Sequence, residues 1–68
     1  MRYLGMLTNA RFLDVGANRV VVAGTTRGVE GRPDGSTFYT EPVDEIDGNI
    51  AKCGDGYFRF QRNLQHAA

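Results

Sequence analysis

Short runs of alternating apolar and polar residues, separated by glycine-containing turns, make up most of this chain. In Tyr57–Arg62 the side chains of Phe58 and Phe60 alternate with polar or amphipathic residues, which is the period of a half-buried β-strand. The segment Arg19–Thr25 is almost entirely apolar around its valines, as in a strand that is covered on both faces. Because the helical spacing of apolar residues is missing, the pattern predicts a β-protein.

Four further segments have the composition of strands. Ser36–Glu41 is rich in β-branched and aromatic residues, and Ile50–Cys53 is a short, mostly apolar run. Near the start of the chain, Arg2–Thr8 and Arg11–Val15 are predicted to form a first hairpin around Asn9. Together with the two segments above, these runs predict five or six short strands.

Glycine and proline predict where the strands end. Asp34-Gly35, Asp47-Gly48 and Asp55-Gly56 each predict a tight hairpin turn, with positive φ at both central residues. Thr26–Asp34 is predicted to be an exposed loop, and Pro42 to occupy a sheet edge or a bulge. We therefore predict an all-β fold: an antiparallel meander that forms a small SH3-like or OB-like barrel or a half-open sheet.

The small size of the chain raises the question of how it is stabilised. Sixty-eight residues make one small domain, residues 1–68, which buries only about 60% of its unfolded surface. Cys53 is the only cysteine, so no internal disulfide can form, and the cysteine and histidine content is too low for a structural metal site. Association is the remaining stabiliser, and we predict a homo-oligomer.

Charge and hydropathy exclude several classes of protein. The eight basic residues balance the eight acidic residues, which argues against general affinity for nucleic acid. No apolar run is long enough to span a bilayer, and the first eight residues do not have the pattern of a signal peptide. With its single thiol, the chain is therefore expected in the cytoplasm, without a membrane partner.

The second half of the chain carries a recognisable order of features. An Asp34-Gly35 turn precedes the strand Thr40-Glu41-Pro42-Val43, and an Ile46-Asp47 turn and the aromatic strand around Tyr57-Phe58 follow. In this order the chain resembles small β-rich proteins of bacteriophages and mobile elements. The resemblance implies an accessory protein that binds and blocks a host protein or defence complex. It implies no residue roles, because such proteins share no common activity.

The residues that could carry catalysis or bind a metal do not form a convincing site. A nucleophilic Cys53 would need a base, and His66, near the end of the sequence, is the only histidine. The acidic cluster lacks the spacing of a calcium loop; it consists of Glu41, Asp44, Glu45 and Asp47. We therefore predict a non-enzymatic protein with no catalytic residue, no metal and no cofactor.

The first hypothesis for function is binding to a larger host protein. Arginine outnumbers lysine seven to one, and arginine's planar fork suits carboxylates, phosphates and aromatic faces. Arg27 and Arg32 lie in the predicted exposed loop, and an acidic edge follows it. The predicted partner-binding residues are Arg27, Arg32, Glu41, Asp44 and Glu45.

The alternative hypothesis is a module that captures a nucleotide or a single-stranded nucleic acid. Aromatic side chains that stack on bases, next to arginines that bind phosphate, are what such a site needs. The predicted ligand-binding residues are Tyr39, Tyr57, Arg59 and Arg62. The phenylalanines are assigned to the core instead; they are Phe12, Phe38, Phe58 and Phe60.

Overall fold

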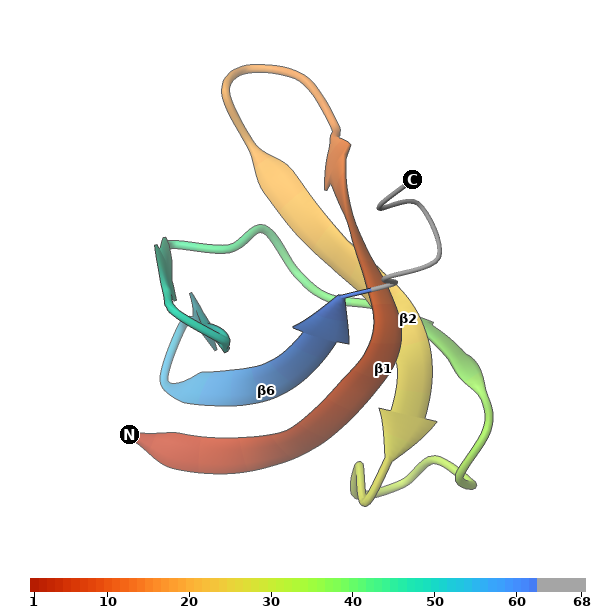
Figure 1. Ribbon diagram of the computed structural model, residues 1–68. Coiled ribbons are helices and arrows are strands. Elements are labelled where there is room, and N and C mark those ends of the chain that lie inside the picture. Colours follow the sequence, from red (N-terminus) through yellow and green to blue (C-terminus); the bar gives the residue numbers. More distant parts are fainter. Residues whose placement is uncertain (63–68) are drawn as a thin grey trace.

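Residues 1–62 form one six-stranded sheet, and the prediction of an all-β fold is confirmed. The computed structural model describes residues 1–62 (Figure 1). Along the sheet the strands follow the order β3-β2-β1-β6-β5-β4. Their bounds are β1 (Arg2–Asp14), β2 (Val20–Arg27), β3 (Thr37–Tyr39), β4 (Glu45–Asp47), β5 (Ile50–Cys53) and β6 (Gly56–Arg62).

Two antiparallel meanders, β1–β3 and β4–β6, lie side by side in this sheet. They meet where β1 pairs with β6, and this pair is parallel, so the prediction of a wholly antiparallel meander is wrong (Figure 1). Residues 40–44 carry the chain from one meander to the other. The amides of Thr40 and Val43 donate to the carbonyls of Val22 and Val20, at 2.9 and 2.8 Å. This crossing brings β6 back to the edge of β1 that would otherwise be unpaired.

The first strand is one continuous, bent element, not the predicted hairpin of Arg2–Thr8 and Arg11–Val15. Asn9 has a φ of 53°, and the pairing register with both neighbouring strands shifts around it. Asparagine adopts this left-handed conformation more readily than most residues, so the segment forms a β-bulge that bends the strand. The first true turn is Gly16-Ala17-Asn18, where all three residues have positive φ.

The two hairpin turns of the second meander are shifted by one residue from the predicted Asp-Gly positions. Asp47 pairs with Ile50 and Cys53 pairs with Gly56, so the central residues are Gly48-Asn49 and Gly54-Asp55. Only the glycine of each turn has positive φ, 60° and 58°, as in a type II′ turn with glycine first. Asp34 and Gly35 do form the centre of a turn, but only Gly35 has positive φ.

The sheet curls around a small core but stays open. Both β3 and β4 are edge strands, so of the predicted forms the half-open sheet is present and a closed barrel is not. The core consists of Leu7, Ala10, Val22, Val29, Ala51, Phe58 and Phe60, with Phe12 and Phe38 packed against it. The predicted core role of the phenylalanines is thus confirmed. Val21 and Val22 point to opposite faces and are both buried, which confirms that the valine segment of β2 is covered on both faces; Arg27 at its end is exposed.

The loop between β2 and β3 is exposed over most of its length, as predicted for Thr26–Asp34, but it is anchored at Val29. Val29 is 8% exposed, and its side chain packs on Gly5 of β1. Thr26 belongs to β2 and is fully buried. Pro42, predicted at a sheet edge or a bulge, lies in the irregular segment between β3 and β4. In residues 1–62 there is no helix that is long and apolar enough to cross a membrane.

Candidate functional site

The pairing register sorts the strand side chains onto two faces. One face packs on the core; we call the opposite one the outer face. On β3, β2, β1 and β6 the polar, charged and aromatic side chains of the outer face are Tyr3, Thr8, Arg11, Thr25, Arg27, Thr37, Tyr39, Tyr57 and Arg59. Lys52 of β5 continues this set next to Tyr57.

Two arginines of the outer face lie in one row across the centre of the sheet. Met6 of β1 pairs with Arg27 of β2 on one side and with Arg59 of β6 on the other. Two strand spacings separate the arginines, so their Cα atoms are about 10 Å apart. Both are exposed, and neither makes an ion pair with the residues that the structure describes.

Tyrosines flank this row, two of them exposed and Tyr57 half-buried. The rings of Tyr3 and Tyr57 lie side by side, with centroids 5.5 Å apart and planes tilted by 50°. On the other side of the row, Tyr39 and Arg11 are the two register partners of Ala23. Tyr3 is 49% exposed and Tyr39 is 56% exposed. The outer face therefore offers aromatic rings at two places, with arginines between and beside them.

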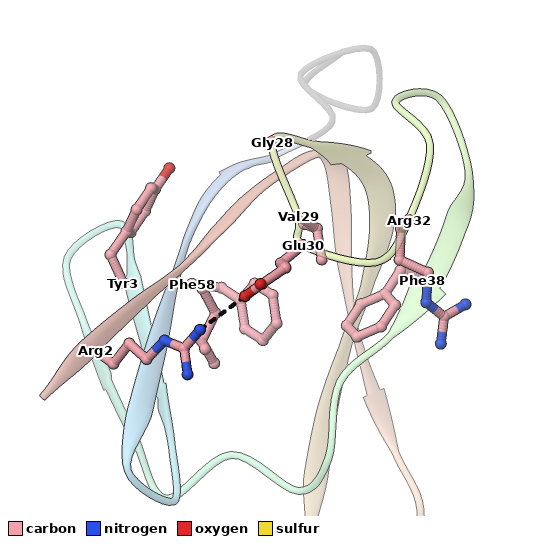
Figure 2. Close-up of a pocket in the computed structure, with 9 residues that line it drawn as sticks. Arg2, Tyr3, Gly28, Val29, Glu30, Arg32, Phe38 and Phe58 are labelled. Carbon is pink, nitrogen blue, oxygen red and sulfur yellow. Dashed lines mark hydrogen bonds and ion pairs between the residues drawn. The ribbon is translucent and has the colours of Figure 1, made fainter.

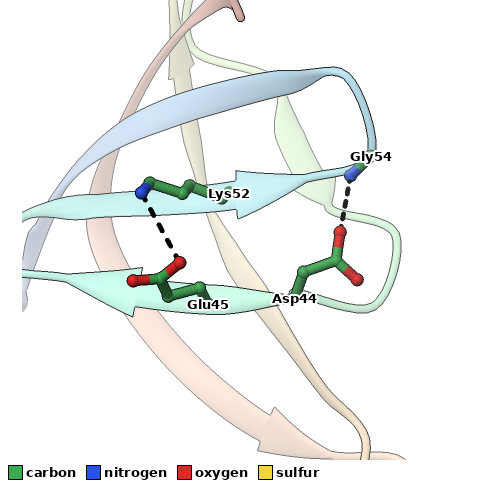
Figure 3. A network of polar contacts seen from close by, with 4 residues as sticks. All are labelled: Asp44, Glu45, Lys52 and Gly54. Atoms are coloured by element: carbon green, nitrogen blue, oxygen red, sulfur yellow. Dashed lines mark hydrogen bonds and ion pairs between the residues drawn. The ribbon is translucent and has the colours of Figure 1, made fainter.

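Carboxylates are confined to the far edge of the outer face. By register, β3, β2, β1 and β6 present no acidic side chain there, whereas Glu45 and Asp47 stand on β4. Glu45 accepts a hydrogen bond from Lys52 at 3.5 Å (Figure 3). A chain with zero net charge thus has a face that is positive over four strands and acidic only at one border.

A hollow lies on the core side of the sheet, between β3 and the first part of β1; we call it the end hollow. Two adjoining parts, of about 690 and 410 Å³, share the lining residues Leu4, Arg32, Phe38 and Phe58. The Arg32 guanidinium lies 5.0 Å from the Phe38 ring centroid. Figure 2 shows the ion pair between Arg2 and Glu30, 2.7 Å long, and Tyr3 pointing away from this group.

The predicted partner-binding residues do not form one site. Arg27 lies on the outer face, and Arg32 and Glu41 line the end hollow. Asp44 and Glu45 line a separate hollow of about 330 Å³. The Asp44 carboxylate accepts a hydrogen bond from the Gly54 amide at 2.9 Å, so it caps the β5–β6 turn (Figure 3).

Three of the four predicted ligand-binding residues share the outer face. Tyr57 and Arg59 occupy alternate positions of β6, and Tyr39 lies across the sheet on β3. Arg62 does not belong to the set. Its guanidinium covers the Phe12 and Phe60 rings, at 4.7 and 6.0 Å from their centroids, and so serves the core.

The thiol of Cys53 is a poor nucleophile in this fold. Burial raises its pKa, the carboxylates of Asp44 and Glu41 raise it further, and a hydrogen bond with Thr40 opposes them. His66, the only histidine that could act as a base for Cys53, lies outside the described residues. Within residues 1–62 no three acidic, cysteine or histidine side chains are grouped to hold a metal ion.

Several outer-face residues were not predicted from the sequence pattern. Tyr3, Arg11 and the threonine row Thr8, Thr25 and Thr37 were not predicted as site residues, because β1 was divided into two strands. Two register shifts in β1, one just after Tyr3 and one around Asn9, place Tyr3 and Arg11 on the same face. Neither these shifts nor the pairing that aligns β1 with β6 can be read from the alternation in the sequence.

No family model, no curated protein and no solved structure matches this chain.

Proposed function

We propose that this chain is a small, non-enzymatic protein that binds single-stranded nucleic acid on its outer face. The observation that carries the proposal is the separation of charge by sheet register. Within residues 1–62, Arg11, Arg27 and Arg59 make no ion pair and stand among tyrosines on the outer face, with the carboxylates of that face kept to the β4 edge.

Each group on this face has a part in binding a flexible polyanion. Bases stack on aromatic rings in a way that tolerates any sequence, and Tyr3, Tyr57 and Tyr39 supply such rings. Arginine guanidinium groups bind backbone phosphates with two parallel hydrogen bonds. The hydroxyl groups of the threonine row add donors and acceptors between the arginines. Glu45 and Asp47 repel phosphate. This repulsion restricts the bound nucleic acid to the part of the outer face formed by β3, β2, β1 and β6.

The face suits single strands better than a duplex. A double helix hides the faces of its bases, so the tyrosines could not stack on them. Exposed bases of DNA and RNA offer the same stacking and phosphate chemistry, and the two ligands are separated by experiment. The alternative ligand of this site is a free nucleotide. Its single base would stack at only one of the two aromatic places on the outer face, and the arginines at the other place would have no phosphate to bind.

Fluorescence anisotropy with a short labelled oligothymidine, and with the matching oligouridine, tests the proposal. We expect both to bind, and we expect Tyr57→Ala to weaken binding by about 1–3 kcal/mol for a lost stacking contact. Arg27→Glu combined with Arg59→Glu should abolish binding at moderate salt, because two phosphate contacts become repulsive. Both arginines are exposed, so the fold should be kept.

Arg32→Glu is the matched control, because it makes the same charge change in the end hollow, away from the outer face. It should leave oligonucleotide affinity nearly unchanged. If Arg32→Glu weakens binding as much as the double outer-face variant, or if neither oligonucleotide binds, the proposal is wrong. A clear preference for oligouridine would identify RNA as the ligand.

Binding to and blocking of a host protein, in the manner of the phage proteins that the sequence resembles, stays a hypothesis, as do the homo-oligomer and the cytoplasmic location. The aromatic strand β6 and the valine strand β2 are both internal in the sheet, so neither has a free edge for pairing with a second copy.

A further inference from the structure

The two edge strands of the sheet differ in how well they are protected. Natural edges are usually guarded against further strand pairing by charges, proline or a bulge. The β4 edge carries Glu45 and Asp47, which discourage the approach of another strand. The β3 edge is Thr37-Phe38-Tyr39, with no charge and no proline. This edge is short, but no charged residue or proline within β3 protects it from pairing with another strand.

Backbone groups of β3 point away from the sheet and are free to pair. The amide of Thr26 donates to the Ser36 carbonyl and the amide of Thr40 donates to the Val22 carbonyl, each at 2.9 Å. Residues in an antiparallel strand alternate in direction, so Ser36, Phe38 and Thr40 face β2. The amide and carbonyl groups of Thr37 and Tyr39 therefore face outward, and they make no hydrogen bond with the described residues.

The free edge borders the smaller part of the end hollow. That part, about 410 Å³, is lined by Phe38 and Tyr39 of β3 and by Leu4, Cys53 and Phe58 across the opening. The rings of Phe38 and Phe58 lie 5.5 Å apart and form an apolar floor. A strand added to β3 would direct alternate side chains toward this floor.

Arg32 gives this place a charge preference. Its guanidinium stacks on Phe38 and makes no ion pair with the residues that the structure describes. A carboxylate on an added strand could pair with Arg32 while a neighbouring apolar side chain fills the hollow. Glu41 lines the same part of the hollow and would repel an acidic residue placed beside it.

From these observations we propose that the free edge of β3 binds an extended peptide of a partner protein as an added strand. The peptide donates to and accepts from the backbones of Thr37 and Tyr39, places one apolar side chain in the end hollow and pairs one acidic side chain with Arg32. This site borders the proposed nucleic-acid face at Thr37 and Tyr39, but it uses their outward backbone groups and the core side of β3, not the arginines of the outer face.

A random peptide library displayed on yeast, selected on the labelled full chain, provides the first test. We expect enriched sequences to alternate apolar and polar residues and to carry one aspartate or glutamate. A synthetic peptide of that consensus, methylated on alternate backbone nitrogens, should bind about tenfold more weakly than the unmethylated peptide, because backbone hydrogen bonds are lost. Arg32→Glu should reverse the preference for the acidic residue.

Thr37→Pro is the matched change in the protein. Proline at the first residue of an edge strand removes only the outward amide, so the fold should be unchanged while the peptide affinity falls. The methylated peptide keeps the test valid if this variant does not fold. No enrichment, or binding that is indifferent to methylation, would overturn the proposal. So would a wild-type dimer that becomes a monomer on Thr37→Pro, because a second copy would then occupy the edge.

Discussion

Gly5 is the residue where one added carbon would do most harm. It has a φ of 132°, and a Cβ built there would lie 2.5 Å from Cγ2 and 2.9 Å from Cα of Val29. Because Cα of Val29 and the carbonyl oxygen of Gly28, which would lie 3.1 Å away, belong to the backbone, a side-chain rotation cannot relieve the clash. We predict that Gly5→Ala destabilises the fold by about 3 kcal/mol or more, from strain and overpacking together. Urea unfolding followed by circular dichroism measures this free energy.

Gly31→Ala is the control for Gly5→Ala. Gly31 also has positive φ, 82°, but its Cβ position is open. Strain alone should cost about 1 kcal/mol there. Equal destabilisation by the two variants would show that Val29 is not anchored on β1.

The raised pKa of the Cys53 thiol predicts a specific pH dependence. Burial disfavours the thiolate, and the nearby carboxylates of Asp44 and Glu41 act in the same direction. The midpoint of the pH profile for alkylation by iodoacetamide should therefore lie higher in the folded chain than in the same chain unfolded in urea. Poor access lowers the rate at every pH but leaves the midpoint unchanged. A folded midpoint at or below the unfolded one contradicts the assigned environment.

The same shift gives the direction of a stability effect. The protonated thiol is favoured in the folded chain, so this contribution is fully present below the unfolded pKa. It is lost as the pH rises from the unfolded pKa through the folded one.

At the scale of elements, two buried threonines hold the short strand β3 in place. Thr40 Oγ1 accepts a hydrogen bond from the Val22 amide at 2.9 Å. At the other end, Thr26 Oγ1 donates to the Pro33 carbonyl and accepts from the Ser36 amide, at 2.9 and 3.1 Å. These contacts explain how three residues can stay ordered at a sheet edge.

Thr40→Val should therefore destabilise the fold by about 1–3 kcal/mol, because it leaves the buried Val22 amide without an acceptor. Thr37→Val makes the same chemical change at an exposed position of β3 and should be nearly neutral. Thermal unfolding of the two variants shows whether Thr40 stabilises the fold through its hydrogen bond or whether the change reflects only the strand propensity of valine. Equal melting temperatures would count against the role of Thr40.

Which elements the sequence reveals depends on the range of the interactions that form them. Ile50–Cys53 was predicted with its observed bounds, and β6 within one residue, because apolar alternation and glycine turns act locally. The hairpin turns were placed one residue away, since Gly-Asn and Gly-Asp at type II′ positions overlap the more familiar Asp-Gly signal. Asn9 was taken for a hairpin turn because a bulge and a turn both use a left-handed asparagine.

Pairings between distant strands explain what the sequence could not reveal about the site. Tyr57 and Arg59 were found from alternation within β6, and Tyr39 from the aromatic run around it. Arg27 was assigned to a different site, and Arg11 to none. Their common face depends on the registers of Met6 with Arg27 and with Arg59, which no local pattern encodes.

For the whole molecule, the arrangement of charges matters more than their sum. Three arginines on the outer face should release counterions when a single strand binds, at about 0.7 ion per phosphate contact, so the logarithm of affinity should fall against the logarithm of salt with a slope of about −2. Anisotropy titrations over a range of sodium chloride measure it. A slope near zero would mean that phosphates are not bound, whatever the effect of the tyrosines.

The parallel pairing of β1 with β6 also affects how the chain folds while it is being synthesised. Each meander can form from neighbouring residues as soon as its three strands have been synthesised. The seam between the meanders cannot, because β1 is made first and β6 last among the strands. Until β6 leaves the ribosome, β1 exposes a long unpaired edge to every other nascent chain nearby. Separately expressed halves, divided between β3 and β4, would have to restore this seam in order to reassemble.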